Sequence, residues 1–263
     1  MTSGLRTGEC VLAWATGFTR NVPDHRFHKI KDVNFPTPVP MPLQRRAEPF
    51  DDPAWLFELK YDGFRALAHV GDGRCTFASR NGHRFGSWLD LSEDIGAGLH
   101  GRNLVLDGEI VCLDERGHPQ FNQLLFRRGT PYYIVYDLLY DGRSDRRYDR
   151  LMDRKQDLKA LVGLSSASRL LYADHIEGNG TALFDRICEL DLEGIVAKYK
   201  YGPYVSERER STWFKIRNRT YSQWAGRDEL FECDRHREPV PGWHSCDLAC
   251  EHAGEVERKE IFG

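Results

Sequence analysis

The stretch Glu58-Leu-Lys-Tyr-Asp-Gly-Phe-Arg65 decides the fold of this chain, because it places one lysine between an acid and a turn glycine. A lysine amine attacks an electrophile in its neutral form, although its ordinary pKa is about 10.4, and burial or a neighbouring cation favours that form. Gly63 has no Cβ, so it lets the backbone come close to a ligand. The pattern predicts a nucleophilic Lys60 at the end of a strand, but taken alone it also fits a charged surface hairpin.

Strands and helices are predicted around this stretch from the spacing of apolar residues. The first strand covers 55–60, and 66–70 is predicted as its return strand. Further strands are expected at 75–79, 104–106 with 110–113, 132–139, 194–198 and 212–216, and helices at 150–161 and 181–190. Because strands and helices do not alternate as regular βαβ units, the predicted fold class is α+β.

Further motifs follow Lys60 along the chain. They are Ser79-Arg-Asn-Gly82, Leu106-Asp-Gly-Glu-Ile110, Tyr136-Asp-Leu-Leu139, Glu193-Gly-Ile-Val-Ala-Lys198 and Trp213-Phe-Lys-Ile-Arg217. In this order, the motifs resemble those of the covalent nucleotidyltransferase superfamily, which contains ATP-dependent DNA ligases, RNA ligases and mRNA capping enzymes. The wording is most similar to bacterial ATP-dependent DNA ligases of the end-joining type. The resemblance covers about 49–223 and implies a nucleotidyltransferase (adenylation) domain of mostly antiparallel sheets with packed helices.

The resemblance implies a DNA ligase that uses ATP, with Lys60 as its nucleophile. Lys60 would attack the α-phosphorus, hold AMP as a phosphoramidate and pass it to a 5′-phosphate, which is then joined to a 3′-hydroxyl in DNA repair or recombination. Glu109 would bind the ribose and help to hold a metal, and Glu193 would be a second metal-binding carboxylate. Two such acids suit Mg²⁺, with Mn²⁺ as a substitute.

The resemblance also assigns residues to the nucleotide. Glu58 would lie near the adenine through its main chain, and Tyr136 would stack on it, which is worth about 1–3 kcal/mol for an aromatic face. The remaining expected contacts are all cationic: Arg65 and Arg80 at the ribose or the 5′-phosphate, Lys198 and Lys215 at the α-phosphate, and Arg217 where the family often has a second lysine. Cations around a reacting phosphate fit a transfer that depends on positioning and charge.

The motifs divide the chain into three zones. Residues 1–48 contain alternating prolines and are expected to be a mobile, extended segment. The resemblance implies an adenylation domain at 49–220, and 221–263 is expected to be a tail with a helix at 225–233. The tail carries Cys233, His236, His244, Cys246, Cys250 and His252, whose irregular spacing fits either a Zn²⁺ site or ordinary side chains. An OB-fold domain, common in ATP-dependent DNA ligases, is expected to be missing.

Composition limits the partners. Of the 263 residues, 40% are hydrophobic and 29% charged, which favours a packed core over disorder. The net charge of −3 means that nicked or broken double-stranded DNA would need a local basic surface or a partner protein. Basic clusters at 143–155 and 208–219 fit such a surface, or a solvated face. No apolar run is long enough for a membrane, and scattered cysteines suggest the reducing cytoplasm.

Two other functions share these motifs. An RNA ligase or a GTP-using capping-type enzyme would use the same lysine and would differ in its nucleotide and its substrate. A nick-binding module without sealing activity is the third hypothesis, which the intact Lys60, Glu109, Glu193 and Lys215 argue against.

Overall fold

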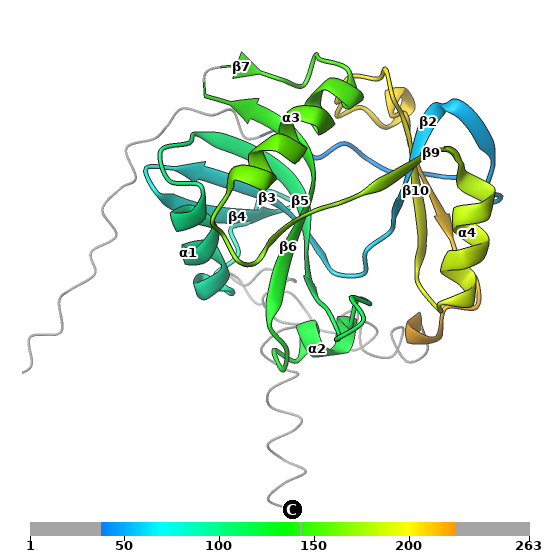
Figure 1. Ribbon diagram of the computed structural model, residues 1–263, viewed down its shortest axis with the longest axis horizontal. Helices are drawn as coiled ribbons and strands as arrows, with labels where there is room; N and C mark the ends of the chain where they lie inside the picture. The colour runs from blue at the N-terminus through cyan, green and yellow to red at the C-terminus, as the bar shows by residue number, and fades with distance from the viewer. Residues whose placement is uncertain (1–37, 143, 225–263) are drawn as a thin grey trace, which may run out of the picture. The chain divides into compact units, whose positions relative to one another are not determined.

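The computed structural model describes residues 38–142 and 144–224, which fold into two β-sheets with packed helices (Figure 1). The five-stranded sheet, sheet A, has the order β1-β11-β10-β2-β9, and the six-stranded sheet B has the path β4-β3-β5-β6-β7 with β8 paired to β6. The neighbouring strands are antiparallel except for β1 with β11 and β6 with β8. This confirms the predicted α+β class.

The elements have the following bounds. Sheet A contains Gln44–Arg45 (β1), Asp51–Leu59 (β2), His175–Asn179 (β9), Gly194–Tyr199 (β10) and Trp213–Arg217 (β11). Sheet B contains Phe64–Gly71 (β3), Arg74–Ser79 (β4), Leu104–Cys112 (β5), Pro131–Asp141 (β6), Ser144–Asp145 (β7) and Leu170–Tyr172 (β8). The α-helices are Leu89–Gly98 (α1), Phe121–Leu125 (α2), Leu151–Leu164 (α3) and Gly180–Glu189 (α4), and 3-10 turns cover Arg208–Arg210 and Ser222–Trp224.

Sheet A separates an apolar face from a polar one, as the alternation of side chains along a strand requires. Its apolar face carries Phe57, Ile195, Ala197 and Ile216, all buried with residues of α4 such as Ile187. Helix α4 lies along this face in Figure 1. The opposite face, with Glu58 and Lys198 on neighbouring strands, is therefore directed away from α4.

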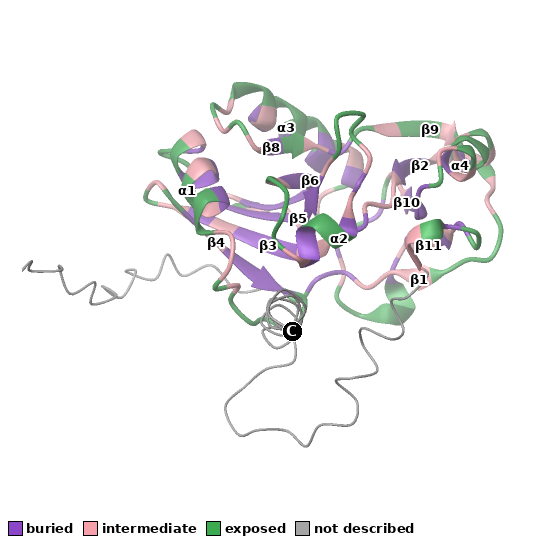
Figure 2. Ribbon diagram, turned by 90° about the horizontal axis from the view of Figure 1, so that it is seen from below, coloured by how far each residue is buried: buried purple, intermediate pink, exposed green. Residues whose placement is uncertain are grey.

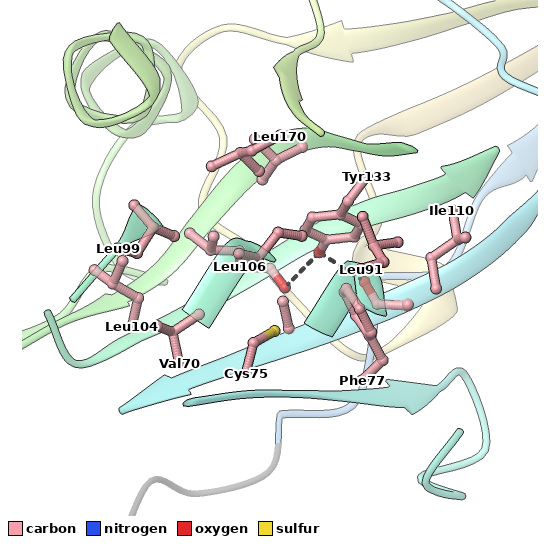
Figure 3. Close-up of a cluster of buried hydrophobic side chains, with 14 of the residues drawn as sticks. Val70, Cys75, Phe77, Leu91, Leu99, Leu104, Leu106, Ile110, Tyr133 and Leu170 are labelled. Carbon is pink, nitrogen blue, oxygen red and sulfur yellow. Dashed lines mark hydrogen bonds between the residues drawn. The ribbon is translucent and has the colours of Figure 1, made fainter. Parts of the chain in front are cut away.

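Sheet B has its own core beneath α1 and α3. Figure 3 shows this cluster, in which Leu91 and Leu99 from the α1 region meet strand residues such as Phe77 and Leu106. The fully buried Tyr133 donates its hydroxyl to the carbonyl oxygens of Ala66 and Leu106, at 2.9 Å and 3.1 Å. These bonds satisfy the one polar group that the ring brings into the core.

A third cluster joins the inner faces of the two sheets. Its sheet A members are Leu56 and Trp213, and its sheet B members include Leu67, Val105 and Leu139. Figure 2 shows buried positions concentrated on the strands and exposed ones on the outer sides of the helices. The cluster holds the sheets together beside the site described below.

The hairpin predicted for 55–70 is wrong. Strand β2 belongs to sheet A and β3 to sheet B, so the chain crosses between the sheets at 60–63. The close approach made possible by Gly63 is to protein backbone, since a Cβ there would lie 2.1 Å from the carbonyl oxygen of Ile110 on β5. Because Gly63 has no side chain, the crossover can pack directly against sheet B.

The part of the N-terminal segment that the structure describes, 38–48, is packed, in contrast to the expected mobile extension. Met41 is fully buried, and Gln44–Arg45 pairs in parallel with β11. The alternating prolines end at Pro42, before this strand, so they remove no hydrogen-bond donor from its pairing with β11. Residues 1–37 and the helix expected at 225–233 lie outside the described residues.

Two further differences concern helices. Helix α1 was not predicted; it contains Gly96 and Gly98, which weaken the helical signal, and its N-cap, Trp88, makes no side-chain cap bond. The basic cluster at 143–155 is not one solvated face, since Arg154 and Lys155 are 0% and 1% exposed. No described helix is long and apolar enough to cross a membrane.

The Asp137–Arg154 pair attaches α3 to β6. Arg154 donates Nε and Nη2 to the two Asp137 oxygens at 2.7 Å and 2.8 Å, and both side chains are 0% exposed. We expect Arg154→Ala to lower the free energy of unfolding by about 3–5 kcal/mol, because it leaves a buried carboxylate without its partner. Urea denaturation measures this change. Lys159→Ala, which removes the exposed Lys159–Asp174 pair, is the control and should cost less than about 1 kcal/mol; equal losses would contradict the prediction.

Candidate active site

An open cavity lies between the inner faces of the two sheets, with about 420 Å³ of empty space that includes open solvent. Sheet A and the crossover contribute Glu58, Lys60 and Lys198, while sheet B contributes Arg65, Glu109 and Tyr136. The remaining lining residues are Leu43, Leu59, Tyr61, Val196 and Trp213.

Lys60 follows the last residue of β2, at the mouth of the crossover. Its backbone N–H donates to the Gly194 carbonyl at 2.9 Å, and its Nζ donates to Glu193 Oε2 at 2.5 Å. Gly194 has a φ of +143° and a Cβ there would lie 2.2 Å from the Ile216 carbonyl oxygen, so a glycine is required beside Glu193. Burial raises the pKa of the Glu193 carboxyl, Asp62 raises it further, and Lys60 opposes both.

Glu58 is the counterion of two buried lysines. Its carboxylate oxygens lie 2.5 Å from Lys155 Nζ of α3 and 2.5 Å from Lys198 Nζ of β10. Burial alone would raise the pKa of Glu58, but the two ammonium groups outweigh it and the pKa is lowered. Burial lowers the pKa of Lys198 to about 8. A predicted contact of the adenine is therefore also a structural acid that joins three elements.

Aromatic rings surround the ammonium group of Lys198. Its Nζ lies 4.0 Å from the ring centroid of Trp213 and 4.3 Å from that of Tyr136. Such cation–π contacts stabilise a desolvated cation. This end of the cavity presents aromatic and aliphatic surface, which suits a flat base, and Tyr136 is the ring expected to stack on it.

Arg65 is fixed by the protein itself. It donates Nε and Nη2 to Asp107 at 3.1 Å and 2.7 Å, and Nη1 to the Met41 carbonyl at 2.7 Å. Tyr204 also donates its hydroxyl to Asp107, at 2.7 Å. The guanidinium group therefore reaches the cavity in one orientation, and the segment at 38–48 helps to set it.

Glu109 occupies the sheet B side of the cavity. Burial raises its pKa to about 8; Lys60 and Arg65 lower it, and Glu193 and Asp107 raise it. Two carboxyl groups with raised pKa values, Glu109 and Glu193, thus lie near the same lysine. Added positive charge between them would favour the ionised form of both.

Cations gather at the other end of the cavity, on β11. Burial lowers the pKa of Lys215 to about 8, and the nearby charges of Arg217, Lys60 and Arg45 lower it further. Arg217 packs its guanidinium 4.6 Å from the ring centroid of Trp224. The site therefore has an aromatic end, at Tyr136 and Trp213, and a cationic end, where Lys60 lines the cavity and Lys215 and Arg217 lie beside it.

The predicted site residues do not all meet. Lys215 and Arg217 do not line the cavity, but Lys215 is close enough to Lys60 and Arg217 for their charges to lower its pKa. Arg80 is exposed and does not line the cavity. The sequence reasoning missed Lys155, Asp107 and Trp213. Lys155 had a signal, because it lies four residues after Leu151 and three before Leu158 on the apolar side of a helix.

The motifs and the fold agree with one known family. Residues 42–217 match the family model described as the ATP dependent DNA ligase domain. The chain belongs to this family. Membership confirms the resemblance found in the motifs and the predicted adenylation-domain fold.

Relatives of this ligase family differ from the chain in length. The multifunctional non-homologous end joining protein LigD of Pseudomonas aeruginosa is 33% identical over 62% of this chain, and the match spans 20% of that protein. The crystal structure of the ligase domain of Mycobacterium tuberculosis LigD is 26% identical, with a TM-score of 0.61 over 70% of this chain and 61% of that one. A mycobacterial DNA ligase D complexed with ATP and MES is 27% identical, with a TM-score of 0.60 over 68% and 60% of the two chains.

The raised pKa of Glu109 predicts a pH-dependent stability. Between its ordinary value of 4.5 and about 8, the folded protein keeps a proton that the unfolded chain has lost, so this group makes stability fall as pH rises. We expect Glu109→Gln to raise the melting temperature at pH 9 by about 2–4 °C, the shift that 1 kcal/mol gives in a chain of this size.

Thermal melts without metal or nucleotide test this at pH 4 and pH 9. The gain should disappear at pH 4, where both states are protonated. The exposed Glu115→Gln is the control and should show no such difference; a gain of the same size at both pH values would contradict the role of the Glu109 proton.

Proposed function

We propose that this chain is the adenylating core of an ATP-dependent DNA ligase, with Lys60 as the residue that becomes adenylated. The observation that carries the proposal is the position of Lys60, which lines a cavity with an aromatic end and a cationic end and pairs with Glu193. ATP has the same polarity, a flat base at one end and phosphates at the other. The family match and the ATP-bound relative support ATP as the nucleotide.

The first reaction forms a bond between Lys60 Nζ and the α-phosphorus of ATP. The bond from that phosphorus to the bridging oxygen breaks, and pyrophosphate leaves. The amine must lose its proton before it attacks, and its hydrogen bond to Glu193 Oε2, 2.5 Å in this structure, must open. Lys215 and Arg217 offset the negative charge that develops on the phosphate.

Two further transfers complete the reaction. An oxygen of a 5′-phosphate in nicked DNA attacks the phosphorus held by Lys60, and the phosphoramidate bond breaks. The 3′-hydroxyl then attacks the 5′-phosphate, and AMP leaves as the DNA strand is joined. Arg65, fixed by Asp107, and the exposed Arg80 are proposed to bind the ribose or the 5′-phosphate.

Glu109 and Glu193 fit a divalent cation. Both carboxyls have raised pKa values, each lies close to Lys60, and the charge of Glu193 contributes to the raised pKa of Glu109. Mg²⁺ is commonly held by one or two carboxylates together with substrate phosphates, and it would supply charge neutralisation at the α-phosphate. The proposed ligands of this chain are those two acids.

The proposed substrate is nicked or broken double-stranded DNA in the repair or recombination of breaks, with an end-joining protein as partner. The LigD relatives are named as non-homologous end joining proteins, which supports this substrate. The match spans one fifth of such a protein, and we propose the same pathway and an end-joining partner for this chain. A reducing cytoplasm suits Cys75, Cys112 and Cys188, which are free thiols.

Covalent labelling tests the assignment of Lys60. We expect α-labelled ATP with Mg²⁺ to leave label on the denatured protein and Lys60→Ala to lose at least 99% of it, because no other amine occupies this position. The exposed Lys159→Ala is the matched control and should label normally. Label that persists on Lys60→Ala would refute the assignment. The same variant should still seal pre-adenylated nicks, since that step needs no free lysine.

The metal requirement gives a separate test. We expect Glu109→Gln and Glu193→Gln each to raise the Mg²⁺ concentration for half-maximal adenylation by about tenfold, since removal of one partner typically costs a metal site 10–100-fold. Titration with Mg²⁺ at saturating ATP measures the effect, with Glu115→Gln as the control. An unchanged Mg²⁺ requirement in both variants would place the metal elsewhere.

A further inference from the structure

Strand pairing puts one more cation on the cavity face of sheet A. Residues paired across neighbouring strands point to the same face of a sheet. Glu58 pairs with Val196, Val196 with Lys215, and Lys215 with Arg45. Glu58 and Val196 line the cavity, so Arg45 continues this row to the edge of the sheet on the same face.

A second row of paired residues crosses the same face of sheet A. Leu56 pairs with Lys198 and Lys198 with Trp213, a row that belongs to the aromatic end of the cavity. The row of Lys215 and Arg45 lies one step along the strands from it, toward the cationic end. Arg45 lies beyond Lys215 across the sheet, about one strand spacing of 4.8 Å farther from Glu58.

Hydrogen bonds other than those of its pairing with β11 also fix the short strand β1. Gln44 donates its side-chain Nε2 to the carbonyl oxygens of Ser211 and Arg208, at 2.7 Å and 3.0 Å. Arg46 donates its backbone N–H to the Lys215 carbonyl at 3.1 Å. Arg45 is therefore carried by a fixed backbone, although its own side chain is exposed.

Arg45 has no carboxylate partner among residues 38–142 and 144–224. It lies close enough to Lys215 to lower the pKa of that amine, together with Arg217 and Lys60. Like charges placed together cost free energy until an anion neutralises them. An arginine fork also suits phosphate oxygens better than a lysine does.

We propose that Arg45 binds the β- and γ-phosphates of ATP and stabilises the pyrophosphate that leaves when Lys60 is adenylated. This rests on the proposed function and names the residue that receives the leaving group. With the α-phosphate at Lys60 and Lys215, the next phosphates extend along the face on which Arg45 stands. Pyrophosphate gains charge as the bond to the α-phosphorus breaks, so a cation there favours the transfer.

An exposed arginine on an edge strand has another use, which is to prevent pairing with other strands. A DNA phosphate is a second source of the same ligand chemistry. Binding of nucleotides with different numbers of phosphates separates these roles from the proposed one. Arg46 provides a matched control, because it is the next residue, has the same charge and packs over the Phe50 ring at 4.0 Å.

The experiment measures dissociation constants by calorimetry for AMP and for α,β-methylene-ATP, which cannot transfer AMP. We expect Arg45→Ala to weaken binding of the triphosphate about fivefold at low salt, to leave AMP unchanged, and to lose this effect as salt rises. Arg45→Lys should recover part of the affinity, and Arg46→Ala should match the wild type. Melting temperatures check that all variants fold.

Three results would overturn the proposal. Equal weakening of AMP and the triphosphate would mean that Arg45 acts on the fold or the α-phosphate. Unchanged triphosphate binding would leave Arg45 as an edge-strand charge. Weaker sealing of pre-adenylated nicks with normal triphosphate binding would assign it to DNA. None of these measurements uses the Lys60 adduct, so failure of adenylation itself is distinguishable.

Discussion

The burial of Glu58 between two ammonium groups is the constraint on which the site depends. The side chain is 3% exposed, and its carboxylate oxygens lie 2.5 Å from Lys155 Nζ of α3 and 2.5 Å from Lys198 Nζ of β10. A charge in such a place is tolerated when its partners and geometry are complete. The strand that carries Glu58 ends one residue before Lys60, so the same contacts that stabilise this acid also fix where the nucleophile emerges.

The gradient along the cavity follows from this arrangement. Because successive residues of a strand alternate, Leu56 and Glu58 lie on the same face of β2, and Lys60 follows the end of that strand. Leu56 shares its row across the sheet with Lys198 and Trp213, and Glu58 shares its row with Val196 and Lys215. Trp213 accompanies the apolar step and Lys215 the charged one. In the proposed complex, the surface for the base and the charges for the phosphates are separated along the strands by a distance that follows from the rise of a β-strand, about 3.3 Å per residue.

Local sequence signals predicted much of the fold. The runs that became β3, β4, β6, β10 and β11 and the helices α3 and α4 were found, because their apolar periodicity is strong. The pairing of β2 with β10 and β9 was not, since strands more than a hundred residues apart leave no mark on each other's local pattern. Lys60 and the acids were found through motif order. Lys155 and Trp213 were missed as site residues because their importance comes from the neighbours that folding brings to them.

Sheet A is built from the two ends of the described region, and this has a consequence for how the molecule assembles. Gln44 bonds to Ser211 across 167 residues of sequence, whereas β3, β4 and β5 follow one another closely. Closure of such long loops costs more entropy than formation of local hairpins, so contacts of high contact order limit the folding rate. Sheet B can form from neighbouring strands, but the nucleotide cavity exists only once both ends of the region have met. The cavity is therefore complete only after residue 217 has been made, so a ligand that binds there would report on completed folding.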